Sequence, residues 1–413
     1  MEITNNSIKT FFFIILYFSL LIGFYLGENS SGGAHPDFLM RTDLIEKFNK
    51  DFKYTFFNYD NFSDRHSPIL IMILSSFNLL GLDLDFIRFI HLNLLPLLVF
   101  ATYKCLTFKF PDINKNILFL ICCVFFLSPN LRSIAIWPDS RISGLVLFFF
   151  SIYFFLKFQK DQKFINCLLN NFFLIFSSYL SPNFSIFFIY FFYYYFRHFG
   201  FSLKLITFLI SNFILSLPMI FYLFILDVNF FKITAVSDVN IYSRLNLSNK
   251  IFIISTLIFF YLIPFIFNNF FIKNFLKNFR INHFYITSII FLVSIFYFNY
   301  SISYTGGGFF FKLSYFLFNN STLFFITSFI SILFIFNIFK LNFNNFLLFL
   351  ILILSTPQLT IYHKYFDVLL IMLFFLFCEF KFDIKKIFNN KFILNIYFFY
   401  LFFLSVNFGR FLI

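Results

Sequence analysis

The segment TFFFIILYFSLLIGFYL, residues 10–26, is apolar, and GENSSGGAHPDFLMRTDLIEKFNKDFKYTFFNYDNFSDRH, residues 27–66, follows it directly. The second segment is polar, acidic and rich in turn residues, and apolar segments then resume and continue almost to the last residue. This pattern is typical of a polytopic membrane protein with one sizeable loop after its first helix. We therefore expect the chemistry of the water side to lie in that loop.

The composition excludes an ordinary soluble globular protein. Of the 413 residues, 60% are hydrophobic and 12% are charged, and the mean hydropathy is +0.86. Average soluble chains carry about 25% charged residues. The net charge of +13 comes from Lys and Arg in short clusters between apolar segments. Such clusters are typical of cytoplasmic loops, so we expect membrane lipids as partners and no nucleic acid.

The apolar runs predict about 13 spanning helices, since a span needs about 20 mostly apolar residues. The first run is expected to be a retained helix, because no small-residue cleavage site of a signal peptide follows it. The runs lie at residues 10–26, 86–106, 116–129, 143–158, 164–180, 184–196, 203–226, 251–271, 284–300, 316–339, 346–360, 366–380 and 391–408.

The basic connections predict the orientation of these helices. If 10–26 and 86–106 are the first two spans, six basic connections fall on one side, which we expect to be cytoplasmic. Residues 27–85 and 129–142 then form the first two outer loops, and run 67–80 is predicted to be an amphipathic helix at the outer interface. The expected fold is all-α and polytopic, with residues 1–413 in one membrane domain of the bacterial inner membrane.

Two acids in the outer loops are the candidate catalytic residues. Asp37 follows Ser30-Ser31-Gly32-Gly33-Ala34-His35-Pro36, where Gly and Pro favour a turn just above the membrane. Asp139 lies in the loop Pro129–Arg141, which contains the only Trp of the chain. Each also has an ordinary structural interpretation: Asp37 as a cap for a helical stretch 38–50, and Asp139 as the residue that opens a helix at 143.

Further candidates are cationic and aromatic residues of the outer side. Arg65 and His66 lie where the first loop returns to the membrane, and Arg141 closes the second loop. Tyr362, His363 and Lys364 place positive charge on the side that otherwise has little, as expected where an anionic head group is held. The alternatives are snorkelling and anchoring in the aromatic belt.

Several kinds of chemistry have no sequence signal. No zinc motif, nucleophile elbow, dinucleotide fingerprint or Walker sequence is present. The Gly306-Gly307-Gly308 run lacks the strand and the Lys of a phosphate loop, and it predicts a turn of close approach, beside substrate in one interpretation. The five Cys lie in or beside apolar segments without metal-ligand spacing, so we expect them to pack in the membrane.

In order, these features resemble the GT-C superfamily of membrane glycosyltransferases, which includes protein O-mannosyltransferases and lipid A aminoarabinose transferases. An acid follows the first span, and a His-x-Pro-aliphatic element opens an interfacial helix. The elements that carry the resemblance are Asp37, His66-Ser67-Pro68-Ile69-Leu70, Gly81 with Arg88, Pro129–Arg141 before a helix that ends in Phe-Leu-Lys at 155–157, and His363-Lys364-Tyr365-Phe366. The layout matches well over roughly the first 160 residues and by helix count beyond them.

The resemblance implies transfer of a sugar from a polyprenyl-phosphate donor to a lipid, glycan or protein acceptor at the outer face. Asp37 would act as base on the acceptor hydroxyl, which requires burial to raise its pKa above that of an ordinary Asp. Asp139 would position the acceptor or hold a divalent metal, and whether a metal is required stays open. The predicted substrate-binding residues are Arg65, His66, Arg141, Tyr362, His363 and Lys364, of which Arg65, His363 and Lys364 would neutralise the departing phosphate.

The sequence departs from the family at two points, and three other functions remain alternatives. Glu28 competes with Asp37 for the role of the first acid, and the terminal soluble domain of some members is missing from the layout. A polysaccharide polymerase or ligase usually has its large outer loop late in the chain. A transporter or flippase would need charges inside its helices. A structural membrane subunit would tolerate replacement of Asp37 and Asp139.

Overall fold

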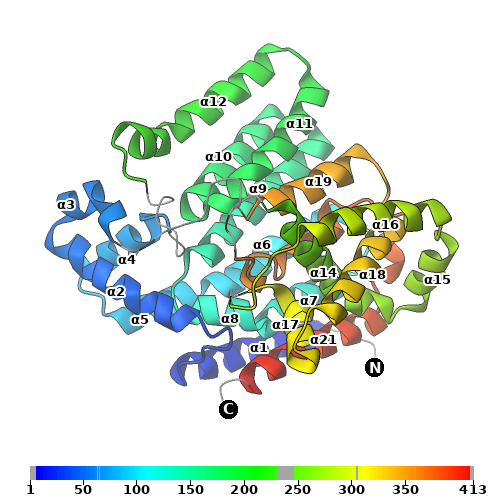
Figure 1. Cartoon of the computed structure of the whole chain (residues 1–413). Coiled ribbons are helices and arrows are strands. Elements are labelled where there is room, and N and C mark those ends of the chain that lie inside the picture. Colours follow the sequence, from blue (N-terminus) through cyan, green and yellow to red (C-terminus); the bar gives the residue numbers. More distant parts are fainter. Residues whose placement is uncertain are drawn as a thin grey trace. The chain divides into compact units, whose positions relative to one another are not determined.

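The computed structural model describes residues 6–62, 64, 66–229, 246–303, 306–356, 358 and 360–409. These residues are predominantly helical (Figure 1). The β-type pairing that they contain is an isolated antiparallel bridge between Phe339 and Phe380. The all-α fold class predicted from the sequence is therefore confirmed.

The chain forms two compact units. The amino-terminal unit comprises Asn5–Pro111, Phe125–Asp238 and Phe403–Ile413, and the carboxyl-terminal unit comprises Met1–Thr4, Asp112–Val124 and Val239–Phe402. The helices of the amino-terminal unit are α1 (Asn6–Tyr25), α2 (Ala34–Lys50), α3 (Phe52–Phe57), η1 (Tyr59–Asn61), α4 (Ile69–Leu79), α5 (Leu84–Leu92), α6 (Leu94–Lys109), α8 (Pro129–Ile136), α9 (Ser140–Asp161), α10 (Phe164–Leu180), η3 (Pro182–Phe187), α11 (Phe188–Phe199), α12 (Leu203–Ile220) and η4 (Phe221–Ile225).

The carboxyl-terminal unit is built around α14 (Leu247–Ile266), which packs against six other helices of the unit: α15, α16, α17, α18, α19 and α20. The short helix η2 (Val124–Leu127) falls at the boundary between the two units. The remaining helices of the carboxyl-terminal unit are α7 (Lys115–Cys123), α15 (Asn269–Lys277), α16 (Ile281–Phe296), α17 (Gly308–Phe318), α18 (Thr322–Ile338), α19 (Phe343–Leu354), η6 (His363–Tyr365), α20 (Leu369–Leu376), η7 (Ile384–Ile387) and α21 (Asn390–Gly409), whose last residues belong to the other unit.

The protein is a multi-pass membrane protein by the length and composition of its helices. Within the described residues, Leu84–Lys109, Ser140–Asp161, Leu203–Ile225, Leu247–Ile266 and Asn390–Phe408 are long and apolar enough to span. Two bent helix pairs bring the number to seven if each pair is one span. Four of the six shorter apolar helices follow predicted runs, namely Lys9–Tyr25, Phe164–Leu180, Thr322–Ile338 and Phe343–Leu354, whereas Ile69–Leu79 follows the predicted interfacial run and Gly308–Phe318 lies mostly between two predicted runs. The predicted number of about 13 spans depends on counting such short helices, and it stays a prediction.

The expected outer loops contain more helix than predicted. Run 67–80 does form a helix, α4, and it packs against α2. The segment 129–142 was predicted to be a loop, but Pro129–Ile136 forms α8. Ser128 caps α8 by accepting a hydrogen bond from the Leu131 N–H at 3.0 Å, and Pro129 suits the first helical position. Asp37 lies in the first turn of α2 instead of a free turn, because a first-turn Pro36 leaves no helical hydrogen bond unmade.

Helix α2 buries one face, which positions the candidate site. Its buried residues recur every three or four positions, the spacing of one helix face. They are Ala34, Phe38, Arg41, Leu44, Ile45 and Phe48. Leu44, Ile45 and Phe48 pack in a core with Leu70, Ile71 and Leu74 of α4. Arg41 is the one charged residue of this buried face, so the fold buries a guanidinium on α2.

Helices α9 and α10 pack so closely that a glycine is needed between them. The Ser177 hydroxyl donates to the Gly144 carbonyl at 2.8 Å. A Cβ at Gly144 would lie 2.8 Å from Ser181 Cβ and 3.1 Å from a ring carbon of Phe184. Both distances are shorter than van der Waals contact, so any larger residue would push the α10–η3 corner away from α9.

We expect Gly144→Val to lower the free energy of unfolding by about 1–3 kcal/mol, because the added side chain overfills this contact. The measurement is chemical denaturation of the detergent-solubilised protein. Ser143→Ala, at the neighbouring partly exposed position of α9, is the matched control and should leave the midpoint unchanged. A Gly144→Val midpoint equal to that of the control would contradict the close packing of α9 and α10.

Candidate functional site

The predicted site residues divide between the two units. Asp37, His66, Asp139 and Arg141 belong to the amino-terminal unit, whereas Tyr362, His363 and Lys364 belong to the carboxyl-terminal unit. Arg65 lies outside the described residues. The two groups are therefore considered separately.

Buried Arg41 is the centre of the group in the amino-terminal unit. Its Nη1 donates to the Pro138 carbonyl at 2.7 Å, and its Nη2 lies 3.5 Å from Asp139 Oδ2. Its Nε forms an ion pair with Asp64 Oδ2 at 3.8 Å. Burial alone would lower the pKa of Arg41, but the charges of Asp139, Asp64 and Asp37 outweigh burial and raise it. The guanidinium is therefore charged and holds together residues that lie far apart in the sequence.

Asp37 and Asp139 reach this guanidinium from different elements. Asp37 lies one turn before Arg41 on α2, on the same side of the helix, and is partly exposed. Asp139 is 2% exposed and caps α9, since its Oδ1 accepts a hydrogen bond from the Arg141 N–H at 2.8 Å. The predicted cap is confirmed, although α9 begins at Ser140 and not at 143. The two candidate acids thus act on one buried cation, and they differ in how much of each is accessible.

Asp64 is the second carboxylate partner of Arg41, and His66 contacts this carboxylate. The backbone N–H of His66 donates to Asp64 Oδ1 at 2.8 Å, and His66 Nδ1 lies 2.7 Å from the same oxygen. Burial raises the pKa of Asp64, but the His66 hydrogen bond and the charges of His66 and Arg41 outweigh burial and lower it overall. Burial and then the charge of Asp64 raise the pKa of Tyr59, so that hydroxyl stays protonated. His66 therefore keeps Asp64 ionised.

Arg141 is held within the protein. Its guanidinium carbon lies 4.3 Å from the centre of the Phe184 ring, and its Nη1 lies 3.5 Å from the Ser181 hydroxyl. The side chain is buried. In this arrangement Arg141 packs the start of α9 against η3, and its predicted contact with substrate stays a prediction.

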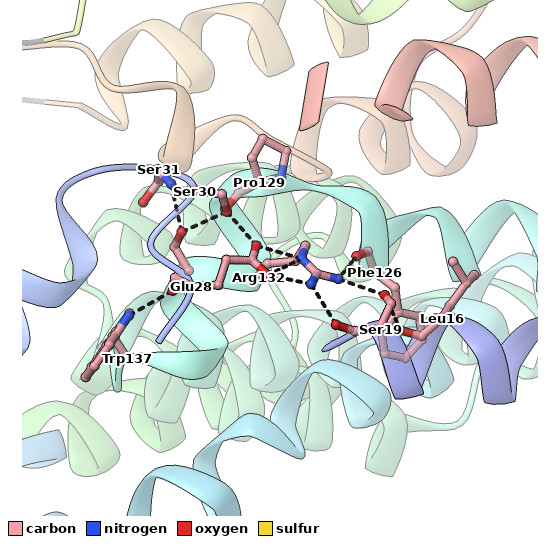
Figure 2. Close-up of polar contacts among 10 residues, drawn as sticks. Leu16, Ser19, Glu28, Ser30, Ser31, Phe126, Pro129, Arg132 and Trp137 are labelled. Carbon is pink, nitrogen blue, oxygen red and sulfur yellow. Dashed lines mark hydrogen bonds and ion pairs between the residues drawn. The ribbon is translucent and has the colours of Figure 1, made fainter. Parts of the chain in front are cut away.

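Glu28 and Arg132 form a separate buried ion pair beside this group (Figure 2). Arg132 Nε donates to both Glu28 oxygens, at 2.7 and 3.0 Å, and Nη2 donates to Oε2 at 2.5 Å. The remaining guanidinium hydrogens point to Ser19 and to the Phe126 carbonyl. A Cβ on Gly23 would lie 2.2 Å from Glu28 Oε2, so only glycine leaves room for the carboxylate. Both oxygens of Glu28 are used by Arg132, and Oε1 also accepts a hydrogen bond from the Ser30 hydroxyl at 2.9 Å, so Glu28 has a structural role here.

Trp137 connects this pair to the start of α2. Its indole N–H donates to the Glu28 carbonyl at 2.9 Å (Figure 2). Its ring packs against His35 with 4.2 Å between the ring centres and 42° between the ring planes, and the Arg88 guanidinium carbon lies 3.8 Å from the centre of the Trp137 ring. The only Trp of the chain thus fixes the position of the loop residues that precede Asp37.

In the carboxyl-terminal unit, His363 is a neutral acceptor. Its Nε2 accepts a hydrogen bond from the Phe309 N–H at 2.9 Å, so this nitrogen carries no proton. Its Nδ1 lies 3.3 Å from the Tyr261 hydroxyl. His363 therefore joins α17 to α14, and its predicted role in phosphate binding stays a prediction.

The glycine run lies against the same segment. The Gly307 N–H donates to the Ile361 carbonyl at 2.9 Å, and a Cβ on Gly306 would lie 2.4 Å from that oxygen. The predicted close approach at the glycine run is confirmed, and the group that it approaches is the backbone of Ile361. Lys364 is half-buried, with its Nζ 5.9 Å from the centre of the Tyr362 ring, which is a cation–π arrangement. The substrate-binding roles of Lys364 and Tyr362 stay predictions.

Across the described part of the chain, no group of three or more His, Cys, Asp or Glu side chains is arranged to hold a metal ion. Asp139 is instead used by a helix cap and a guanidinium. The sequence left the need for a metal open, and the described residues offer no ligand set for one.

Comparisons with protein families, with curated proteins and with solved structures found no match. The geometry of the site therefore carries the functional argument by itself.

We predict that Glu28→Gln lowers the free energy of unfolding by about 3–5 kcal/mol, because it leaves the buried Arg132 charge without its partner. Denaturation in detergent measures this loss. Glu46→Gln removes an acid from the exposed Glu46–Lys50 pair of α2, whose side chains are 71% and 80% exposed, and should change stability by less than about 0.5 kcal/mol. Equal effects of the two variants would show that the buried pair is not a structural anchor.

A second prediction concerns the pH dependence of stability. A carboxyl whose folded pKa is lowered stabilises the fold above its unfolded pKa, and this contribution is lost as the pH falls through the folded pKa. His66→Asn removes the main cause that lowers the pKa of Asp64, while burial, which raises it, remains. Acid unfolding of His66→Asn should therefore begin at a higher pH than that of the wild type, within about pH 3–5. His198→Asn, at an exposed position, should follow the wild-type curve.

Proposed function

We propose that the protein transfers a sugar from a polyprenyl-phosphate donor to a lipid, glycan or protein acceptor at the outer face of the membrane. One observation carries the proposal: Asp139 lies 3.5 Å from the buried guanidinium of Arg41, and Asp37 lies one helical turn before Arg41 on the same side of α2. Burying a cluster of charged groups costs free energy because the groups lose their hydration. A protein that contains such a cluster often uses it for function.

The accessibility of the acids assigns their roles in this proposal. Asp37 is partly exposed, so it accepts a hydrogen bond from the acceptor hydroxyl and takes its proton as the oxygen attacks the anomeric carbon. The bond between that carbon and the donor phosphate oxygen breaks, and its electron pair leaves with polyprenyl phosphate. Asp139 is buried and capped into α9, so it is a positioning residue that acts through Arg41.

The proposal includes a GT-C-like fold with about 13 spans and an interfacial helix α4 in the first outer loop, in the inner membrane of a bacterium. The support for these points is the resemblance in the order of the loop motifs and the side on which the basic connections fall. The roles predicted for Tyr362, His363 and Lys364 lie in the other unit, and the proposal rests on none of them.

A second candidate function is transport or flipping of a lipid, and one observation favours it. Asp367 is 1% exposed and accepts a hydrogen bond from the Tyr400 hydroxyl at 2.9 Å. Tyr400 belongs to the spanning helix Asn390–Phe408, so this unit buries a carboxyl group against a membrane helix. Buried ionisable groups of this kind are common in transport pathways.

We predict that the purified protein releases polyprenyl phosphate when given polyprenyl-phosphate sugars and a membrane lipid extract, and that Asp37→Asn slows release by about 10²–10⁴-fold. Asp139→Asn should slow release by a smaller factor, because Asn caps a helix as well as Asp does but no longer pairs with Arg41. The measurement is the initial rate of polyprenyl phosphate release, with the fold of each variant checked by gel filtration and circular dichroism.

Asp43→Asn is the matched control, because Asp43 is an exposed acid of the same helix α2. Its rate should equal that of the wild type. Release at the wild-type rate by Asp37→Asn, or no release by the wild type with any donor, would refute sugar transfer. A flippase test with a fluorescent lipid in vesicles, comparing Asp367→Asn with the wild type, would then decide on the second candidate.

A further inference from the structure

Lys250 is a buried lysine for which the described residues provide no counter-charge. It lies in the first residues of the spanning helix α14 in the carboxyl-terminal unit and is only 2% exposed. Its Nζ has no hydrogen-bond partner within the part of the chain that the structure describes. By contrast, the buried Arg41 and Arg132 of the amino-terminal unit each contact carboxylates.

An uncompensated charge of this kind costs several kcal/mol when it is buried, even after the surroundings relax. The first turn of α14 has no acidic residue, although acids are the favoured charge at a helix N-terminus. A lysine in this place therefore opposes the helix dipole as long as the site holds no anion. An anion at this place would be attracted by the Lys250 ammonium group and by the positive end of the helix dipole.

The end of α14 also offers hydrogen-bond donors. Asn246 caps the helix: its side-chain oxygen accepts from the Asn249 N–H at 3.3 Å, and its carbonyl accepts from the Lys250 N–H at 3.2 Å. The N–H groups of Leu247 and Ser248 lie in the part of a first turn that has no partner within the helix. Helical side chains lean toward the N-terminus, so the Lys250 stem runs back toward these groups.

The turn is held in place from the side. Asn299 contacts both Asn246 and Asn249 through their side-chain amides, and its own N–H donates to Asn249 Oδ1 at 3.0 Å. Leu247 is exposed, so the turn reaches the molecular surface at one residue while Lys250 is covered. A fixed first turn with open N–H groups and one ammonium group is the donor set that phosphate oxygens accept.

We propose that the first turn of α14, Leu247 to Lys250, binds a phosphate group, with Lys250 Nζ and the N–H groups of Leu247 and Ser248 as its donors. The phosphate comes from the head group of a membrane lipid or from inorganic phosphate. This binding does not depend on sugar transfer and stands if that activity is absent.

Thermal unfolding of the full chain in detergent tests the site, because a ligand that binds only the folded state raises the unfolding temperature. Inorganic phosphate is titrated against sodium chloride at equal ionic strength. In a second arm, micelles with phosphatidic acid are compared with micelles that contain diacylglycerol. The variants are Lys250→Gln, Lys250→Arg and, as control, Lys273→Gln at an exposed lysine of α15 in the same unit.

We expect at least one phosphate-bearing ligand to stabilise the wild type, Lys250→Arg and Lys273→Gln, and to bind Lys250→Gln about tenfold or more weakly, the cost of losing one charged hydrogen bond. Stabilisation by phosphatidic acid alone identifies a lipid phosphate, and stabilisation in both arms shows that phosphate itself suffices. Without ligand, Lys250→Gln should be at least as stable as the wild type. Equal binding by Lys250→Gln, or no stabilisation of the wild type in either arm, overturns the proposal. If Lys250→Gln does not fold, the wild-type and Lys250→Arg titrations decide alone.

Discussion

A charged guanidinium that is buried in an apolar protein needs compensating partners, and in the amino-terminal unit two buried guanidinium groups are compensated by carboxylates. Arg132 of α8 forms an ion pair with Glu28, and Arg41 of α2 forms ion pairs with Asp139 and Asp64. The Arg41–Asp139 and Glu28–Arg132 pairs join the segment 27–66 to residues 98 and 104 positions away in the sequence, and both guanidinium groups also donate to backbone carbonyls. Breaking either pair leaves a buried charge, which is the more costly half of such an interaction. The first loop is therefore a docked element of the fold.

These two pairs also separate structural acids from the candidate catalytic acid. Glu28 uses both of its oxygens for Arg132, and Asp139 divides its two between a helix cap and Arg41. Asp37 interacts electrostatically with Arg41, and it is more exposed than Glu28 and Asp139. An accessible acid whose neighbours are fixed by ion pairs has the defined position that an acid–base group needs.

The sequence predicted the helices better than the contacts between them. The run 164–180 became α10 with both boundaries as predicted, because charged residues and a Ser-Pro step border it. Helix α8 was missed because Asn130, Arg132 and Ser133 interrupt its hydropathy, whereas in the fold their polar groups are buried together with their partners. Arg41 was also missed, although a signal existed: a cation between Phe38 and Leu44 on an apolar stripe has to be paired. Which acid pairs with it depends on tertiary structure, and periodicity carries no such information.

The histidines show why residue type alone assigns roles poorly in such a chain. His363 looked like a cation near an anionic head group, yet a backbone N–H points at its Nε2 and requires the neutral ring. His66 looked like part of a family motif, yet its first effect is to keep Asp64 ionised beside Arg41. In both cases the structure gives the histidine a hydrogen-bond partner that residue type alone does not reveal. The partner that each charged group contacts therefore indicates its role, and Lys250, a buried lysine whose Nζ has no hydrogen-bond partner within the described fold, favours a ligand from outside.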